Sequence, residues 1–238
     1  LSLSIDAYTQ QGLRRSINQD CIGIGSWRGG AGGGTEFSLD YLSEQKSELF
    51  LLSDGIGGHD DGEIASRFAV DSIFELFQSQ DNFDILSAIS ETHEKLAKIG
   101  LGSLRPLGAT LVGLILTKNL VTIFSLGDSG CFHFNENKMI NVTEDTKSPK
   151  VHSNIIEQCL GGGIKKPKPS IVQRKFEFGD IFILMSDGVG NWVDVEKINN
   201  VIQSKHLNFS KKLCSTAKIS GSNDDLSAVV IKTKSPQT

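Results

Sequence analysis

Two apolar runs in this chain end in the same three polar residues. Leu49–Leu52 is followed by Ser-Asp-Gly, and so is Ile181–Met185. A strand that is apolar on both faces must be covered on both faces, so each run predicts a buried strand. Asp54 and Asp187 therefore stand at the rim of a core, on rigid supports. Asp224 precedes a third apolar run, and we predict that the three acids form one site.

The rest of the pattern predicts further strands and paired helices. Apolar residues three or four apart indicate amphipathic helices over Gly62–Gln78 and Phe83–Ile99, and two more are expected over Val195–Ser204 and Ser210–Ile219. The predicted strands are Leu3–Thr9, Cys21–Gly25, Glu48–Ser53, Thr110–Leu116, Val121–Leu126, Gly130–Phe134, Ser170–Phe176, Ile181–Met185 and Leu226–Lys232. Because hairpin-spaced strands are interrupted by helix pairs, we predict an α+β fold instead of a βαβ alternation.

Composition narrows the class of protein. The 238 residues, 38% of them hydrophobic, contain no linker-like segment, so we expect one domain over residues 1–238. A net charge of −4 argues against a nucleic-acid partner. The apolar runs are shorter than the roughly 20 residues that span a bilayer, so no membrane partner is expected. Four widely spaced cysteines form no CxxC pair and favour a reducing, cytoplasmic compartment over a disulfide framework or zinc knuckle.

The glycine-rich segment Gly29–Gly34 has the composition of a phosphate cradle. No Gly-Lys-Ser or Gly-Lys-Thr follows it, however, and such a sequence completes a phosphate-binding loop. We therefore predict a hairpin loop without a catalytic role.

A longer motif follows the first Asp. The segment Asp54-Gly-Ile-Gly-Gly-His59-Asp-Asp-Gly-Glu63-Ile-Ala-Ser66 closely resembles the signature of the metal-dependent serine/threonine protein phosphatases, the PPM or type 2C family. Five other blocks of that family occur in the right order: Arg15-Ser-Ile-Asn-Gln-Asp20, Gly108-Ala-Thr110, Gly127-Asp-Ser129, Ser186-Asp-Gly188 and Asp224-Asp-Leu-Ser227. The resemblance implies a four-layer α-β-β-α sandwich of two mainly antiparallel sheets flanked by helix pairs, with a dinuclear metal site between the sheets at one end.

Phosphate monoester hydrolysis is among the slowest uncatalysed reactions, so charge neutralisation is needed. Two hard cations can polarise the phosphoryl oxygens and activate a water between them, and oxygen ligands select Mg²⁺ or Mn²⁺. By resemblance, Asp54 bridges the two ions, the Gly55 carbonyl binds one, and Asp187 and Asp224 hold the other. The alternative for each Asp alone is a helix cap or a turn carboxylate.

Three further residues take expected roles from the resemblance. Arg15 is expected to clamp the phosphate, because a guanidinium fork matches two phosphoryl oxygens; its alternative is a surface salt bridge. Gln19 stands where the family often has an acid, so Asp20 is expected to carry more of the charge at that ion, through water. His59 is expected to help the leaving alkoxide as a general acid. Its alternative is to order the glycine-rich turn by hydrogen bonds.

A third, weaker metal position is implied for Asp128, with an ordinary Gly-Asp turn as the alternative. The family usually has Arg where Gly130 stands, and often an acid where Asn191 stands, although Asp194 is close by. Both departures concern the third ion more than the first two.

The resemblance implies one-step hydrolysis of phosphoserine or phosphothreonine in proteins, by attack of a metal-bridging water and without a phosphoenzyme. We expect phosphoprotein substrates, an opposing serine/threonine kinase pathway and a monomer. One alternative is a metal-binding pseudophosphatase that docks a partner, against which retention of the metal-site acids argues. A second is a Ca²⁺-binding structural sandwich, which would need neither Arg15 nor His59.

Substrate choice in the family commonly involves a helical flap beside the active site, opened by an Asp-His pair. Here Asp145-Thr146 stands at that opening, and only Lys147–Leu160 follows, with Pro149 interrupting its first turn. We expect a short flap and broad activity on unrelated phosphopeptides.

Overall fold

The computed structural model describes residues 2–32, 36–43, 47–56, 61–100, 106–118, 120–136, 138–143, 158–204 and 208–235, with the backbone alone over 36–43. His59, the end of the glycine-rich segment and most of the expected flap lie outside the described residues.

The described strands form two sheets, and every pair of neighbouring strands is antiparallel. The first sheet contains, in spatial order, β10 (Lys138–Asn141), β9 (Gly130–Asn135), β13 (Ile181–Met185), β14 (Leu226–Lys234), β1 (Ser2–Gln10) and β4 (Glu36–Ser43). The second contains β11 (Leu160–Gly161), β6 (Gly108–Ala109), β5 (Glu48–Ile56), β7 (Leu111–Leu116), β8 (Leu120–Leu126) and β12 (Ser170–Lys175), while β2 (Asp20–Ile24) pairs with β5 and with β3 (Trp27–Gly30).

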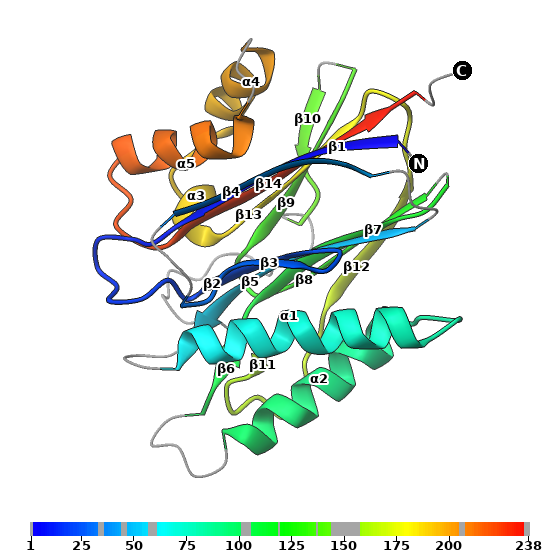
Figure 1. The fold of residues 1–238 in the computed structure, drawn as a ribbon, viewed down its shortest axis with the longest axis vertical. Coiled ribbons are helices and arrows are strands. Elements are labelled where there is room, and N and C mark those ends of the chain that lie inside the picture. The colour runs from blue at the N-terminus through cyan, green and yellow to red at the C-terminus, as the bar shows by residue number, and fades with distance from the viewer. Residues whose placement is uncertain are drawn as a thin grey trace.

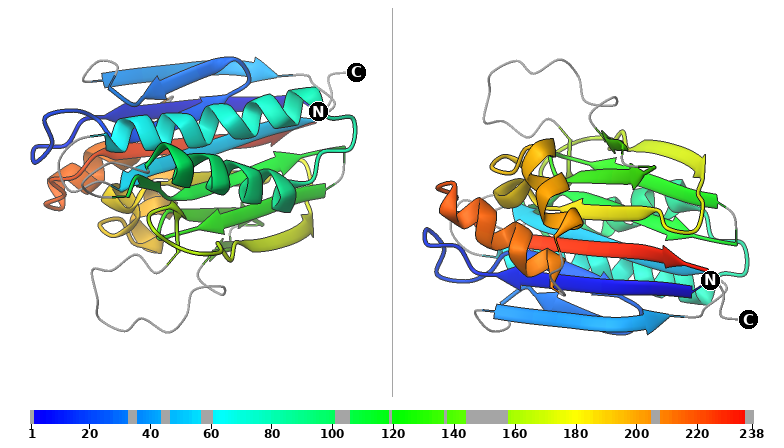
Figure 2. Two further views of the ribbon diagram at one scale, coloured as in Figure 1. Left: turned by 90° about the horizontal axis from the view of Figure 1, so that it is seen from below. Right: turned by 90° about the horizontal axis from the view of Figure 1, so that it is seen from above.

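Helices cover the outer face of each sheet (Figures 1 and 2). The second sheet carries α1 (Gly62–Ser79) and α2 (Ile85–Ile99), and the first carries α4 (Val195–Gln203), α5 (Phe209–Ile219) and the one-turn α3 (Asp187–Gly190). This arrangement confirms the predicted α+β class and the α-β-β-α layering.

Alternation along the strands explains why the sheets need cover on both faces. On β5, Phe50 and Leu52 pack between the two sheets, whereas Leu49 and Leu51 pack among residues of α1 and α2. On β13, Phe182 and Leu184 face the space between the sheets, and the alternate residues pack against α4 and α5. Since side chains alternate with a period of two, one apolar run supplies two core layers.

Several strand boundaries differ from the sequence prediction. β5 continues through Asp54 to Ile56, and β3 takes in Gly29 and Gly30, which were predicted to lie in a loop. The short strands β6 and β11 have only two residues each, too few for a periodic pattern. Among the described residues, no helix is long and apolar enough to cross a membrane.

Candidate active site at one end of the sandwich

Strand pairing brings the first two carboxylates together. Asp20 on β2 is the direct cross-strand partner of Asp54 on β5. Ile22 and Ile24 continue the Asp20 face of β2, as Phe50 and Leu52 continue the Asp54 face of β5, and all four pack between the sheets. Both acids therefore project from their strands toward the space between the two sheets.

The other predicted acids reach the same end from the first sheet. Met185, the last residue of β13, pairs with Ala228 of β14 and with Gly130 of β9. Asp187 follows β13, Asp224 precedes β14 and Asp128 precedes β9, so the three acids lie at the same end of the first sheet. Asp187 interacts electrostatically with Asp54, Asp128 and Asp224. The structure thus brings together the five aspartates that were predicted from the sequence to form the metal site.

Burial, together with mutual repulsion, raises the pKa values of several carboxylates in this cluster. Burial, and then repulsion by Asp20, Asp187, Asp128 and Asp224, raises the pKa of Asp54 well above its usual value. Burial and repulsion by Asp128 and Asp224 raise the pKa of Asp187 to about 6. Burial is also the main reason that the pKa of Asp20 is raised. The cluster is therefore short of positive charge.

Some buried oxygen atoms of this cluster lack a hydrogen-bond partner, and this bears on whether the cluster can bind cations. Both carboxylate oxygens of Asp20 and the Gln19 Oε1 atom are buried without a hydrogen-bond partner among the described residues. The Ser186 and Ser227 hydroxyls offset part of the rise in the Asp20 pKa, but neither forms a hydrogen bond with Asp20. Buried oxygen donors of this kind, crowded by like charges, suit hard divalent cations such as Mg²⁺ or Mn²⁺.

The acidic cluster suits divalent cations because of its negative charge and its oxygen donors. No three His, Cys, Asp or Glu side chains in the described part of the chain already surround one point as a ligand set.

Gly55 hydrogen-bonds through its N–H to the Gln19 carbonyl at 3.1 Å. A Cβ atom at Gly55 would lie 2.0 Å from the Gly62 carbonyl oxygen, so only glycine permits this close packing.

Arg15 supplies positive charge at the rim. It lies in the loop between β1 and β2, and its Nε is 3.1 Å from Asp224 Oδ1. Burial acts to lower the pKa of Arg15, but attraction to Asp224, Asp54 and Asp225 outweighs it and raises that pKa. Its side chain is about one-third exposed, at 32%, so the guanidinium can reach solvent. The neighbouring Arg14 is exposed.

Several residues that support Asp54 had no role predicted from the sequence. The Asp54 N–H donates to Thr110 Oγ1 at 3.0 Å, and the Thr110 N–H donates to the Asp54 carbonyl at 2.8 Å. Thr110 Oγ1 in turn lies 3.0 Å from Ser129 Oγ. Ser129 follows Asp128, so this hydrogen-bond network connects the end of β5, which carries Asp54, with the loop that carries Asp128. The family-like blocks ending in Thr110 and Ser129 were the available signal.

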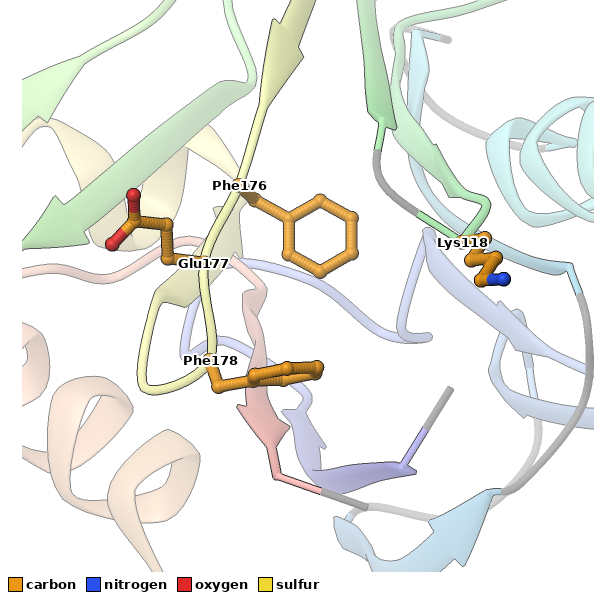
Figure 3. A pocket seen from close by; sticks show the side chains of 4 residues that line it. All are labelled: Lys118, Phe176, Glu177 and Phe178. Carbon is orange, nitrogen blue, oxygen red and sulfur yellow. The ribbon is translucent and has the colours of Figure 1, made fainter.

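A small hollow at the opposite end of the sandwich is separate from this cluster. It has a volume of about 350 Å³ and is lined by Lys118, Phe176, Glu177 and Phe178 (Figure 3). Glu177 is the one carboxylate in this lining, and none of the cluster acids takes part.

The family model described as "Protein phosphatase 2C" matches residues 37–230. The chain belongs to the protein phosphatase 2C family. This confirms the resemblance seen in the sequence.

Individual relatives agree with this family. The serine/threonine protein phosphatase PstP of Mycobacterium tuberculosis is 23% identical over 97% of this chain, which spans 45% of that protein. The S. agalactiae serine/threonine phosphatase structure has a TM-score of 0.78 at 21% identity, covering 98% of this chain and 100% of the other. The catalytic domain of PstP, solved in complex with two manganese ions, has a TM-score of 0.73 at 20% identity, covering 98% and 100%. At these identities the structural likeness establishes the fold.

The roles of individual site residues remain predictions. The structure gathers Asp20, Asp54, Asp128, Asp187 and Asp224 at one end, with Arg15 beside them. His59 lies outside the described residues.

Proposed function

We propose that this 2C-family member is a metal-dependent protein phosphatase that hydrolyses phosphoserine and phosphothreonine in proteins. The observation that carries the proposal is the cluster of mutually repelling carboxylates at one end of the sandwich, with Arg15 at its rim. Such a site attracts divalent cations, and the cations with the arginine attract a phosphate dianion. Family membership and the manganese-bound structure of PstP support the proposal.

Within this site, Asp54, the Gly55 carbonyl, Asp187 and Asp224 would hold two Mg²⁺ or Mn²⁺ ions. Asp20 would contribute charge nearby, and Asp128 would serve a third, weaker position. When bound, the cations supply positive charge and Lewis acidity toward the phosphoryl oxygens.

The chain's own groups have separate tasks. Arg15 would exchange its contact with Asp224 for the phosphoryl oxygens of the substrate, since a guanidinium can hold two oxygens at once. By resemblance, His59 would donate the proton that the leaving serine or threonine oxygen requires. Water is the nucleophile, so the products are the free hydroxyl and inorganic phosphate, without a phosphoenzyme.

The cysteines agree with a water nucleophile. All four are free and buried. Burial raises the pKa of Cys159 to about 11 and that of Cys21 to about 12, and it also raises the pKa values of Cys131 and Cys214. None of these thiols is ready to act as the thiolate of a cysteine-dependent phosphatase.

Turnover of p-nitrophenyl phosphate tests this function. Chelator-stripped protein should be inactive and should recover activity with added Mn²⁺. Manganese binding without any hydrolysis of p-nitrophenyl phosphate or a phosphothreonine peptide would instead favour the pseudophosphatase.

The location, oligomeric state and opposing pathway of the protein are also proposals. Free cysteines favour a reducing compartment, and we propose a cytoplasmic location. We further propose a monomer, organised as one catalytic domain over residues 1–238, that opposes a serine/threonine kinase pathway.

A further inference from the structure

Asp225 holds both ends of the loop that carries Arg15. Its carboxylate is buried, with 3% of the residue exposed. Asp225 Oδ1 accepts the Gly12 N–H at 2.7 Å, and Oδ2 accepts the Gln19 N–H at 2.8 Å. Arg15 lies between these two anchor points. One carboxylate therefore closes the segment Gly12–Gln19 at both ends.

Backbone packing reinforces this attachment. The Arg14 N–H donates to the Asn223 carbonyl at 3.1 Å. A Cβ atom at Gly12 would lie 2.2 Å from the carbonyl carbon of Asp224, so the two backbones approach as closely as glycine allows. The Gln11 side chain adds a hydrogen bond to the Arg15 carbonyl at 2.7 Å. The Arg15 loop is thus docked on the segment just before β14.

A carboxylate suits this position better than an amide does. Both groups that bond to Asp225 are backbone N–H donors, and an ionised carboxylate offers only acceptors. An Asn side chain would accept from one of them and present its own NH₂ to the other. The segment would then lose one of its two anchors while the side chain kept its size.

We propose that Asp225 is a positioning residue, which fixes the Arg15 backbone so that the guanidinium meets the substrate's phosphoryl group. The inference rests on the proposed phosphate-binding role of Arg15. An arginine side chain has many rotamers, so a fixed backbone reduces the freedom that it loses when it binds phosphate. Both carboxylate oxygens of Asp225 accept backbone N–H groups of the Arg15 loop, so Asp225 acts through that loop.

A double-mutant cycle between Asp225→Asn and Arg15→Ala tests this. At saturating Mn²⁺, Asp225→Asn should lower kcat/KM for a phosphothreonine peptide roughly tenfold. In the Arg15→Ala background the same change should have less than about a twofold effect, because the arginine through which it acts is gone. The Mn²⁺ concentration for half-maximal activity should stay within about twofold. Additive losses, or a large rise in that concentration, would overturn the proposal by showing that Asp225 acts through the adjacent Asp224.

A control variant separates positioning from general destabilisation. Asp6→Asn is the matched control, because Asp6 is a buried carboxylate that accepts the Ser210 N–H at 3.0 Å, away from the Arg15 loop. It should lower the melting temperature without altering the Arg15 contribution. An equal effect of Asp6→Asn on that contribution would refute a specific role for Asp225.

An NMR readout decides the matter independently of catalysis. In the Mg²⁺ form, the Arg15 Nε–H signal, assigned with Arg15→Lys, should shift or broaden in Asp225→Asn and remain unchanged in Asp6→Asn. An unchanged signal in Asp225→Asn would overturn the proposal. Absence of turnover in the wild type would refute the proposed function, while the NMR signal would still report whether Asp225 positions Arg15.

Discussion

Asp187→Asn should make the metal-free protein more stable while abolishing its activity. Asp187 is buried and is repelled by Asp128 and Asp224, so its ionised form is unfavourable. Replacing a repelled carboxylate by a neutral group of the same shape removes the cost of ionising it. In the metal-bound protein the same change would remove a proposed metal ligand.

The size of the gain follows from the pKa of Asp187. That pKa lies at about 6 in the folded protein, against an ordinary value of 3.8. At about 1.4 kcal/mol for each pH unit, the ionised Asp187 costs the fold about 3 kcal/mol. For a domain of this size, a change of that magnitude raises the melting temperature by roughly 6–12 °C.

The pH dependence has a definite sign. Because the folded pKa is raised, the Asp187 contribution to stability is fully present below the unfolded value of 3.8 and is lost as the pH rises through about 6. The advantage of Asp187→Asn should therefore be full at pH 8, shrink through about pH 6, and vanish near pH 4.

Denaturant unfolding in chelator, with wild type and variant compared at each pH, measures this gain. Asp194→Asn is the matched control, since Asp194 caps α4 with its side chain 63% exposed, outside the cluster. It should give no gain. A loss of stability in Asp187→Asn at pH 8, or a gain that persists at pH 4, would refute the claim that burial and repulsion disfavour the ionised Asp187.

Three further results are expected. Arg15→Ala should lower kcat/KM by roughly 10- to 150-fold, the value of a charge-assisted contact, and Arg14→Ala should change it little; equal losses would show that Arg15 is not the clamp. Thr110→Val removes the side-chain acceptor of the Asp54 N–H and should cost about 1–3 kcal/mol of unfolding free energy in denaturant melts, whereas an unchanged midpoint would contradict the support assigned to Thr110. A panel of phosphothreonine peptides with scrambled flanks should vary little in kcat/KM, and a spread of several hundredfold, about 3–4 kcal/mol, would show that the flanking sequence is recognised.

The sequence predicted the elements that carry strong periodicity. The limits of β13 are as predicted, and α1 and α5 differ by one residue at an end. Apolar runs that bury both faces leave little freedom in assignment. By contrast, β3 contains Gly29 and Gly30, and its place depends on pairing with β2, which no local pattern reveals.

The residues of the candidate site also differ in how far the sequence could predict them. Acids at the ends of apolar strands could be nominated because the strand fixes where each Asp emerges. The role of Asp225 could not, since its bond to the Gly12 N–H joins residues 213 positions apart. Thr110 and Ser129 were visible only as members of short blocks, and their contact depends on how β7, β8 and β9 are arranged. Hydrogen-bond partners of this kind follow from the tertiary fold.

The most direct test of the central claim is phosphate release from a phosphothreonine peptide as a function of Mn²⁺ concentration, for wild type and Asp54→Asn. Asp54 is repelled by all four of the other cluster aspartates, and it is the residue that we propose as a ligand shared by the cations. We predict no release in chelator, saturable release by the wild type with Mn²⁺, and none by Asp54→Asn even at the highest concentration. Near-normal kcat in Asp54→Asn at saturating Mn²⁺, or undiminished wild-type turnover in chelator, would contradict the account.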